Sequence, residues 1–170
     1  MKLIEAMKKV KELTKKAEDL RKKVSANCAI SSIETQTYSD QRRQIAEWIQ
    51  AHSDVLKEIL RLRVAIQRTN LNTRVTIELG GKSVDKTIAE WIHRRRDLSG
   101  LELAMWSALT DKNIKEGTAA GPSGAVIQIS INRFYDPAER DAKRDLYTSE
   151  PYIIDSRLEV VNAITDLIEE

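Results

Sequence analysis

The sequence predicts a mainly helical protein: a long antiparallel helical hairpin or bundle with coiled-coil seams and a small antiparallel β element. Two long stretches carry apolar residues at steps of three and four, the spacing of a helix that packs on a partner helix. Charged residues make up 32% of the chain and aromatic residues 5%, which is typical of long charged helices. Shorter stretches alternate apolar and polar residues, which is the pattern of β-strands. With 170 residues the chain is long enough for its own core, so we expect one domain over residues 1–170.

The helical hairpin is expected over residues 1–70. Apolar side chains form a heptad seam over residues 3–24, and nearly every residue between them is charged. A loop rich in Ser and Thr follows, and Ser39 or Asp40 is suited to cap the second helix. The second helix repeats the heptad spacing up to about residue 68.

These two seams are our candidate interaction surface. Its members share seam positions in the two helices: Leu3, Val10, Leu13, Leu20, Ile45, Trp48, Val55, Ile59 and Ile66. His52 occupies a seam position of the second helix as well. We expect His52 to be a packed residue, and its role as a switch stays open.

A β-hairpin is expected over residues 74–84, because apolar residues alternate there and Gly80-Gly81 suits a tight turn. A third helix is expected over residues 85–110. The tripeptide Gly81-Lys82-Ser83 is similar to the tail of a phosphate-binding loop, but Thr76 stands where that loop needs a glycine. We therefore predict no nucleotide binding at the turn.

The last third of the chain is expected to contain a connector, a strand and helices. Residues 111–125 hold three glycines and a proline, and we expect a flexible connector. Over residues 126–170 we expect a strand at 126–132 followed by C-terminal helices. Asp136-Pro137 is a helix start, and Pro151 is expected to interrupt or kink that helix. Residues 74–84 and 126–132 together are expected to form one three-stranded antiparallel sheet.

The pattern of reactive side chains argues against an enzyme. The chain has one cysteine and two histidines, and no catalytic, cofactor-binding or metal-binding motif stands out. We expect no cofactor and, with a single cysteine, no disulfide framework. The consecutive arginines Arg94, Arg95 and Arg96 would spread around a helix, which favours an ion-paired surface over a track for phosphates. No nucleic-acid partner is therefore expected, although the role of these arginines stays open.

The distribution of charge along the chain predicts which segments pack together, and its hydropathy bears on membrane insertion and secretion. Residues 1–24 hold nine Lys or Arg against four Asp or Glu, a net charge of +5, and residues 136–170 hold four against ten, a net charge of −6. We expect these two segments to lie together, within one chain or across an interface. No apolar run approaches the ~18 residues of a transmembrane helix, and the N-terminus lacks the apolar stretch of a classical secretion signal.

Two short motifs are similar to those of a known family. The opening Met-Lys-Leu-Ile-Glu-Ala and the stretch Ile66-Gln67-Arg68-Thr69-Asn70 with Thr73 resemble the septicolysin-like family of small helical proteins. The resemblance covers roughly residues 1–110. It implies a helical fold, and the family name implies a cytolysin, but no mechanism or catalytic residue comes with it.

Together these features favour a non-enzymatic structural or interaction protein that self-associates. We expect a homo-oligomer, or a complex with other protein subunits of a larger assembly such as a phage particle. Two alternatives stay open: a membrane-active, cytolysin-like toxin, and a prefoldin-like holdase, since helical coils joined by a β-hairpin also describe that class. The expected location is the cytoplasm, or the virion if a phage encodes the chain.

Overall fold

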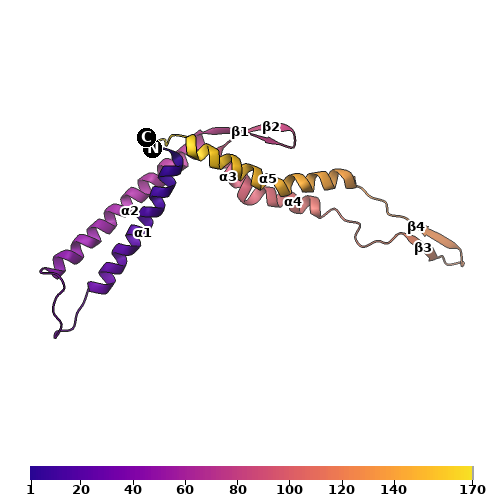
Figure 1. Ribbon diagram of the computed structural model, residues 1–170. Coiled ribbons are helices and arrows are strands. Elements are labelled where there is room, and N and C mark those ends of the chain that lie inside the picture. Colours follow the sequence, from indigo (N-terminus) through magenta and orange to yellow (C-terminus); the bar gives the residue numbers. More distant parts are fainter. Residues whose placement is uncertain (170) are drawn as a thin grey trace. The chain divides into compact units, whose positions relative to one another are not determined.

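The computed structural model describes residues 1–169 and is mainly helical, with two small two-stranded sheets (Figure 1). Contacts between residues divide the chain into two compact units. The first holds residues 1–75, 87–89 and those from 158 onward, and the second holds residues 76–86 and 90–157. The expected single domain stays a prediction, and each unit is described by itself.

Two long helices dominate the first unit, α1 (Leu3–Asn27) and α2 (Gln41–Asn72). The start of α1 is stabilised by Glu5, whose carboxylate accepts a hydrogen bond of 2.7 Å from the Lys2 backbone N–H. The start of α2 is capped as predicted, because the Asp40 carboxylate accepts a hydrogen bond of 2.9 Å from the Arg43 backbone N–H. Exposed loop residues, Ile30 and Ile33 among them, connect the two helices.

The core of the first unit forms where the two heptad seams meet. Ala17 and Leu20 of α1 and Val55 and Ile59 of α2 make a buried apolar cluster. The partly buried residues that pack against this cluster are Val10, Leu13, Trp48 and Ala51. Figure 1 shows α1 and α2 side by side over most of their length. The two helices therefore bury part of each seam against one another, which removes those apolar side chains from water.

The two ends of the chain meet in the first unit. The Leu3 backbone N–H donates to the Thr165 carbonyl at 2.9 Å, and the Leu167 N–H donates to the Met1 carbonyl at 2.8 Å. Between these bonds, Lys2 Nζ lies 2.9 Å from the Asp166 carboxylate. The expected proximity of the basic start and the acidic end is thus confirmed at the first turn of α1. The middle of α1 packs on α2 instead.

The first sheet is a hairpin of β1 (Arg74–Leu79) and β2 (Lys82–Thr87). Its turn is made by Gly80 and Gly81, whose φ angles of +55° and +75° suit glycine. The predicted hairpin turn is confirmed. The predicted boundary with the third helix is wrong, because β2 continues to Thr87 and α3 (Ile88–His93) begins only after it. The polar alternation Lys-Ser-Val-Asp-Lys-Thr gave too weak a β signal to extend the strand.

The predicted third helix is not one regular α-helix. After α3 the chain forms a π-helical segment, Arg94–Leu98, and then α4 (Ser99–Ser107). Within the second unit, Arg94 Nε donates to the buried Glu150 carboxylate at 2.5 Å, and Ser99 Oγ donates to the same carboxylate at 3.0 Å. A π-helical turn admits an extra residue into the helix, and π turns often mark sites under such a constraint.

The consecutive arginines are all ion-paired, as predicted. Arg94 pairs with Glu150, Arg95 with Asp155 and Arg96 with Asp97. The hydrogen bonds that the Arg94 guanidinium donates to the Glu150 carboxylate raise the pKa of Arg94. The guanidinium also lies over the Tyr147 ring, with 5.7 Å from its central carbon to the ring centre. Arg94 therefore makes a partly buried contact within the second unit, whereas Arg95 and Arg96 form ion pairs at its surface.

The second sheet pairs β3 (Gly117–Ala120) with β4 (Val126–Ile129) in antiparallel register. Two predictions are wrong here. The expected connector over residues 111–125 contains β3, and the expected three-stranded sheet is two separate hairpins. A strand that pairs with its neighbour across a short turn closes a smaller loop than one that pairs with a distant hairpin, and so it loses less chain entropy.

The last helix is α5 (Pro137–Ile164). Its start is confirmed, since the Asp136 carboxylate accepts a hydrogen bond of 2.9 Å from the Ala138 N–H, and Pro137 occupies the first turn. Pro151 lies inside α5 without ending it. The predicted interruption is therefore wrong, because α5 continues past the backbone donor that proline removes, and the alternative of a kink at Pro151 stays a prediction.

Candidate interaction surface

The nine residues of the predicted seam lie in the first unit. Leu3, Leu20, Val55 and Ile59 are buried. The other members are partly buried: Val10, Leu13, Ile45, Trp48 and Ile66. Six of the nine belong to the buried cluster between α1 and α2 or pack against it: Val10, Leu13, Leu20, Trp48, Val55 and Ile59. His52 is also partly buried, and it lines a shallow hollow with Leu20 of α1.

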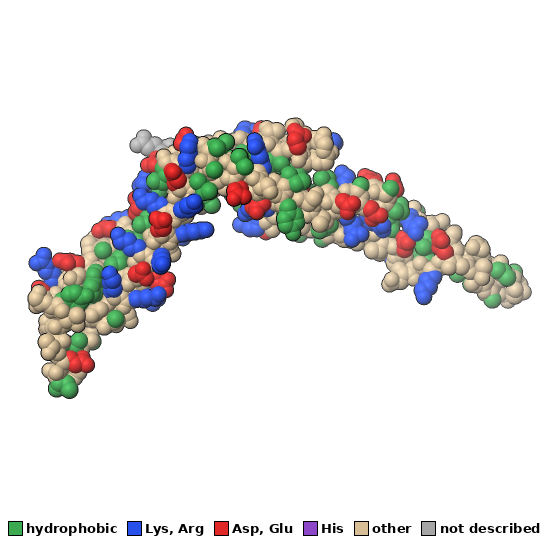
Figure 2. All heavy atoms as spheres, viewed as in Figure 1, with side chains coloured by type: hydrophobic (Ala, Val, Ile, Leu, Met, Phe, Trp, Pro, Cys, Tyr) green, Lys and Arg blue, Asp and Glu red, His purple; other side chains and the backbone are tan. Residues whose placement is uncertain are grey.

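A second candidate surface lies in the second unit, on residues 117–132, which we call the arm; the rest of the chain leaves it exposed. It consists of β3, β4, the turn between them and the following residues 130–132, and it carries no charged side chain. Every residue of both strands is exposed, including the large apolar Val126, Ile127 and Ile129. Figure 2 shows the end of the second unit that holds β3 and β4 without the blue or red of charged side chains.

The register of the arm sorts its side chains onto two faces. Ala119 pairs with Ile127 and Gly117 with Ile129, so the larger side chains of β4 stand opposite small residues of β3. The turn is closed by a hydrogen bond of 2.7 Å from the Gly121 N–H to the Ala125 carbonyl. Gly124, with a φ of +77°, supplies the left-handed residue of the turn. Because the β3 residues opposite them are small, Ile127 and Ile129 are not covered by side chains of their own sheet.

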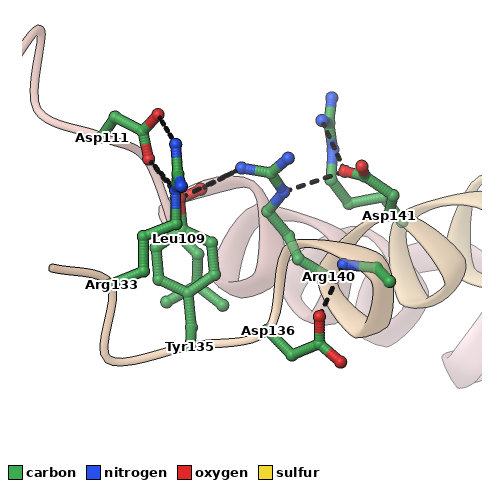
Figure 3. Close-up of polar contacts among 9 residues, drawn as sticks. Leu109, Asp111, Arg133, Tyr135, Asp136, Arg140 and Asp141 are labelled. Carbon is green, nitrogen blue, oxygen red and sulfur yellow. Dashed lines mark hydrogen bonds and ion pairs between the residues drawn. The ribbon is translucent and has the colours of Figure 1, made fainter. Parts of the chain in front are cut away.

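Polar side chains join the two ends of the arm to each other (Figure 3). Arg133, just after the arm, donates two hydrogen bonds to Asp111 before it, with Nε–Oδ1 at 2.8 Å and Nη2–Oδ2 at 2.7 Å. The Tyr135 hydroxyl donates to Asp111 Oδ1 at 2.9 Å. Arg140 of α5 donates to the Leu109 carbonyl and to the Tyr135 hydroxyl, both at 3.2 Å. We call Asp111, Arg133, Tyr135 and Arg140 the clamp.

The clamp is a charge-assisted network. The Arg133 guanidinium, followed by the Tyr135 hydroxyl, lowers the pKa of Asp111 to about 2, and Asp111 in turn raises the pKa of Arg133. The fork of Arg133 on a carboxylate is the geometry that best fixes orientation as well as distance. Asp111 is therefore ionised at neutral pH, and the clamp holds the two ends of the arm together there.

A hollow of about 300 Å³ lies beside the clamp, lined by residues on both sides of the arm. Its apolar walls include Leu109, Ile114 and Ile131, and Phe134 at its rim is fully exposed. An aromatic ring wholly in water is unusual in a folded chain, since burying a Phe side chain is favourable by about 1.5–3 kcal/mol. Uncovered apolar surface thus continues from the strands to the base of the arm.

Sequence reasoning predicted one strand of the arm, at 126–132, but missed its partner β3 and the clamp. In the clamp, Asp111 contacts Arg133 and Tyr135 across 22 and 24 positions, and no local spacing in the sequence predicts such pairings. The arm did leave a signal, because residues 117–132 are an uncharged stretch in a chain with 32% charged residues. That contrast, together with the Gly-Pro-Ser-Gly segment in its middle, is the pattern of a neutral hairpin.

The described part of the chain offers neither a metal site nor a membrane-spanning helix as another candidate site. Among residues 1–169, no group of three or more His, Cys, Asp or Glu side chains is placed to hold a metal ion. None of the helices in that part of the chain is long and apolar enough to cross a membrane. No protein-family model, no curated protein and no solved structure matches the chain.

Proposed function

We propose that this chain is a non-enzymatic structural protein that self-associates, as one component of a larger assembly such as a phage particle. In this proposal α1 and α2 act as an antiparallel helical hairpin with coiled-coil seams, and the arm engages a neighbouring copy. One observation carries the proposal: the arm is uncharged and uncovered, yet the clamp holds both of its ends in place.

The stability of a two-stranded hairpin supports an arm that is completed by another chain. Two strands alone are marginal in water, and three or more strands or a covering surface are needed for a stable sheet. Exposed strand edges are usually protected by charges, proline or bulges. β4 has neither charge nor proline, so its edge is open for a strand from a neighbour.

A second copy is the neighbour that the composition of the arm favours. Two uncharged arms approach each other without electrostatic repulsion, and each brings the β-branched residues Val126, Ile127 and Ile129 to the contact. The clamp adds to this by ordering the base of the arm before contact, which lowers the entropy lost on binding.

The experiment replaces residues 114–131 with a short Gly-Ser linker, keeping Asp111 and Arg133 for the clamp. We expect helix content and melting temperature to stay near those of the wild type in circular dichroism. We expect the mass measured by light scattering to fall. A matched control replaces the exposed loop residues 30–36 of the first unit with a linker, which should leave the mass unchanged.

Two results would contradict the proposal. An oligomer of unchanged mass after replacement of the arm would show that the arm makes no contact with a neighbour. A wild-type chain that is monomeric at all concentrations, and that releases dye from lipid vesicles, would favour the cytolysin class implied by the family resemblance.

A further inference from the structure

A second apolar stripe runs along α2, outside the cluster that α1 covers. Its members are all exposed: Ile49, Leu56, Leu60, Val64 and Leu71. At about 100° per residue, they fall within an arc of roughly 80° on the helix, centred well away from the buried Val55 and Ile59. Leu60, in the middle, has 64% of its surface exposed. Figure 2 shows hydrophobic side chains reaching the surface over the unit that holds α1 and α2.

The stripe is symmetric along the sequence. Ile49 and Leu71 each lie 11 residues from Leu60, and Leu56 and Val64 each lie 4 residues from it. A copy of α2 that runs antiparallel about a two-fold axis at Leu60 therefore meets the same pattern in reverse. Leu60 faces its own equivalent, Leu56 lies beside Val64 of the second copy, and Ile49 lies beside Leu71 of the second copy. A two-fold contact requires this self-complementarity.

The surface beside Ile49 has a shape that fits this arrangement. A hollow of about 200 Å³ is lined there by Leu20, Arg21, Val24, Ile49 and His52. In the antiparallel pair, Leu71 of the second copy lies opposite this end of the stripe. The hollow offers apolar walls to that leucine, and the two-fold axis repeats the contact at the other end.

Two cations near the middle of the stripe are paired within the first unit, whereas Arg63, three residues from Leu60, is exposed. Lys57 Nζ lies 3.2 Å from the Asp54 carboxylate, and Arg61 Nη2 lies 2.9 Å from the Glu58 carboxylate. The stripe itself carries no charged residue, so two copies bring apolar side chains, and not like charges, together at its centre.

We propose that α2 pairs in antiparallel with α2 of a second copy of this chain, about a two-fold axis at Leu60. This inference rests on the proposed function, because it names one of the contacts through which the chain self-associates. It is separate from the arm, which belongs to the other unit.

Cysteine cross-linking tests the geometry. In a Cys28→Ser background, which removes the exposed native thiol, a short homobifunctional maleimide should link two chains that carry Leu60→Cys. Ile49→Cys and Leu71→Cys should each give little covalent dimer alone and should give it when the two proteins are mixed. Cross-linking of Ile49→Cys to itself would mean a parallel pair and would overturn the proposal.

A charge substitution tests the contribution of the contact to assembly. Leu60→Glu places two carboxylates on the axis and should weaken self-association at least tenfold in sedimentation equilibrium. Thr14→Glu adds the same charge to an exposed position of α1 and should leave association unchanged. Both sites are exposed, so the variants should keep the helix content of the wild type.

The outcomes separate this inference from the proposed function. A chain that stays oligomeric while Leu60→Cys gives no cross-link and Leu60→Glu keeps its mass overturns the α2 pairing and leaves self-association standing. A monomeric chain whose Leu60→Glu variant loses binding to anionic lipid vesicles would make the stripe a membrane-contacting face, and would overturn both.

Discussion

The contact between α1 and α2 and the arm of β3 and β4 are held in place by opposite means. The helices bury an apolar cluster and need no ion pair at its centre. The arm buries almost nothing, and charge-assisted hydrogen bonds at the clamp fix its two ends. Hydrophobic burial depends little on pH and salt, whereas a half-exposed ion pair depends on both. The helical contact is complete within one chain, but the arm leaves apolar surface for another.

The largest effect on stability should come from the helical contact. Ile59→Ala removes a buried side chain from the cluster and should lower the free energy of unfolding by about 2–4 kcal/mol, since the cavity left behind adds to the lost burial. Chemical denaturation of the monomer measures it. The exposed Lys57→Ala on the same helix should change stability far less. Equal losses in the two variants would mean that the cluster does not hold α1 to α2.

The clamp should affect the arm without affecting the helices. Arg133→Ala removes both hydrogen bonds to Asp111 and frees the end of the arm from its partner. Amide exchange over residues 117–129 should accelerate, while exchange in α1 and α2 stays as it was. Arg96→Ala breaks an ion pair outside the clamp and is the matched control. Unchanged exchange in the arm of Arg133→Ala would show that the arm is ordered by other contacts.

Lowering the pH should weaken the clamp of the arm without affecting the apolar cluster of α1 and α2. The folded-state pKa of Asp111, about 2, lies below its ordinary value near 3.9, so ionised Asp111 stabilises the clamp at all pH values above that range. This stabilisation is lost as the pH falls toward and through 2. The apolar cluster of α1 and α2 contains no group that titrates there. Carboxyl-carbon NMR should give a midpoint near 2 for Asp111, and Arg133→Ala should move it upward. A midpoint near 3.9 in the wild type would contradict the clamp.

The smallest effect should come from the ion pair between the chain ends. Lys2→Ala removes the contact with Asp166, but the backbone bonds of Leu3 and Leu167 remain. We expect slightly faster amide exchange in the first turn of α1 and no measurable change in melting temperature, because exposed pairs contribute little. Exchange that accelerates along the whole of α1 would mean that the ends, and not the α2 contact, order this helix.

The sequence predicted the helices better than the arm for a physical reason. Apolar residues that pack between helices recur every three or four positions, so the local spacing around Leu20 and Val55 predicts which side of each helix is buried. The arm depends on pairing between Gly-Thr-Ala-Ala and Val-Ile-Gln-Ile, and only the second half has strong β propensity. The clamp depends on Asp111 meeting Arg133 across the whole arm, which no local pattern encodes. The π-helical segment begins at Arg94, which contacts the buried Glu150, another distant residue.

Amide exchange of the arm as a function of protein concentration tests the central claim most directly. If neighbouring copies cover the arm, residues 117–129 should exchange fast in dilute protein and become protected as concentration rises, while the α1–α2 cluster stays protected throughout. Exchange in the arm that is equally fast at the lowest and highest concentrations would contradict the account, because the uncovered surface would then have no partner among copies of this chain.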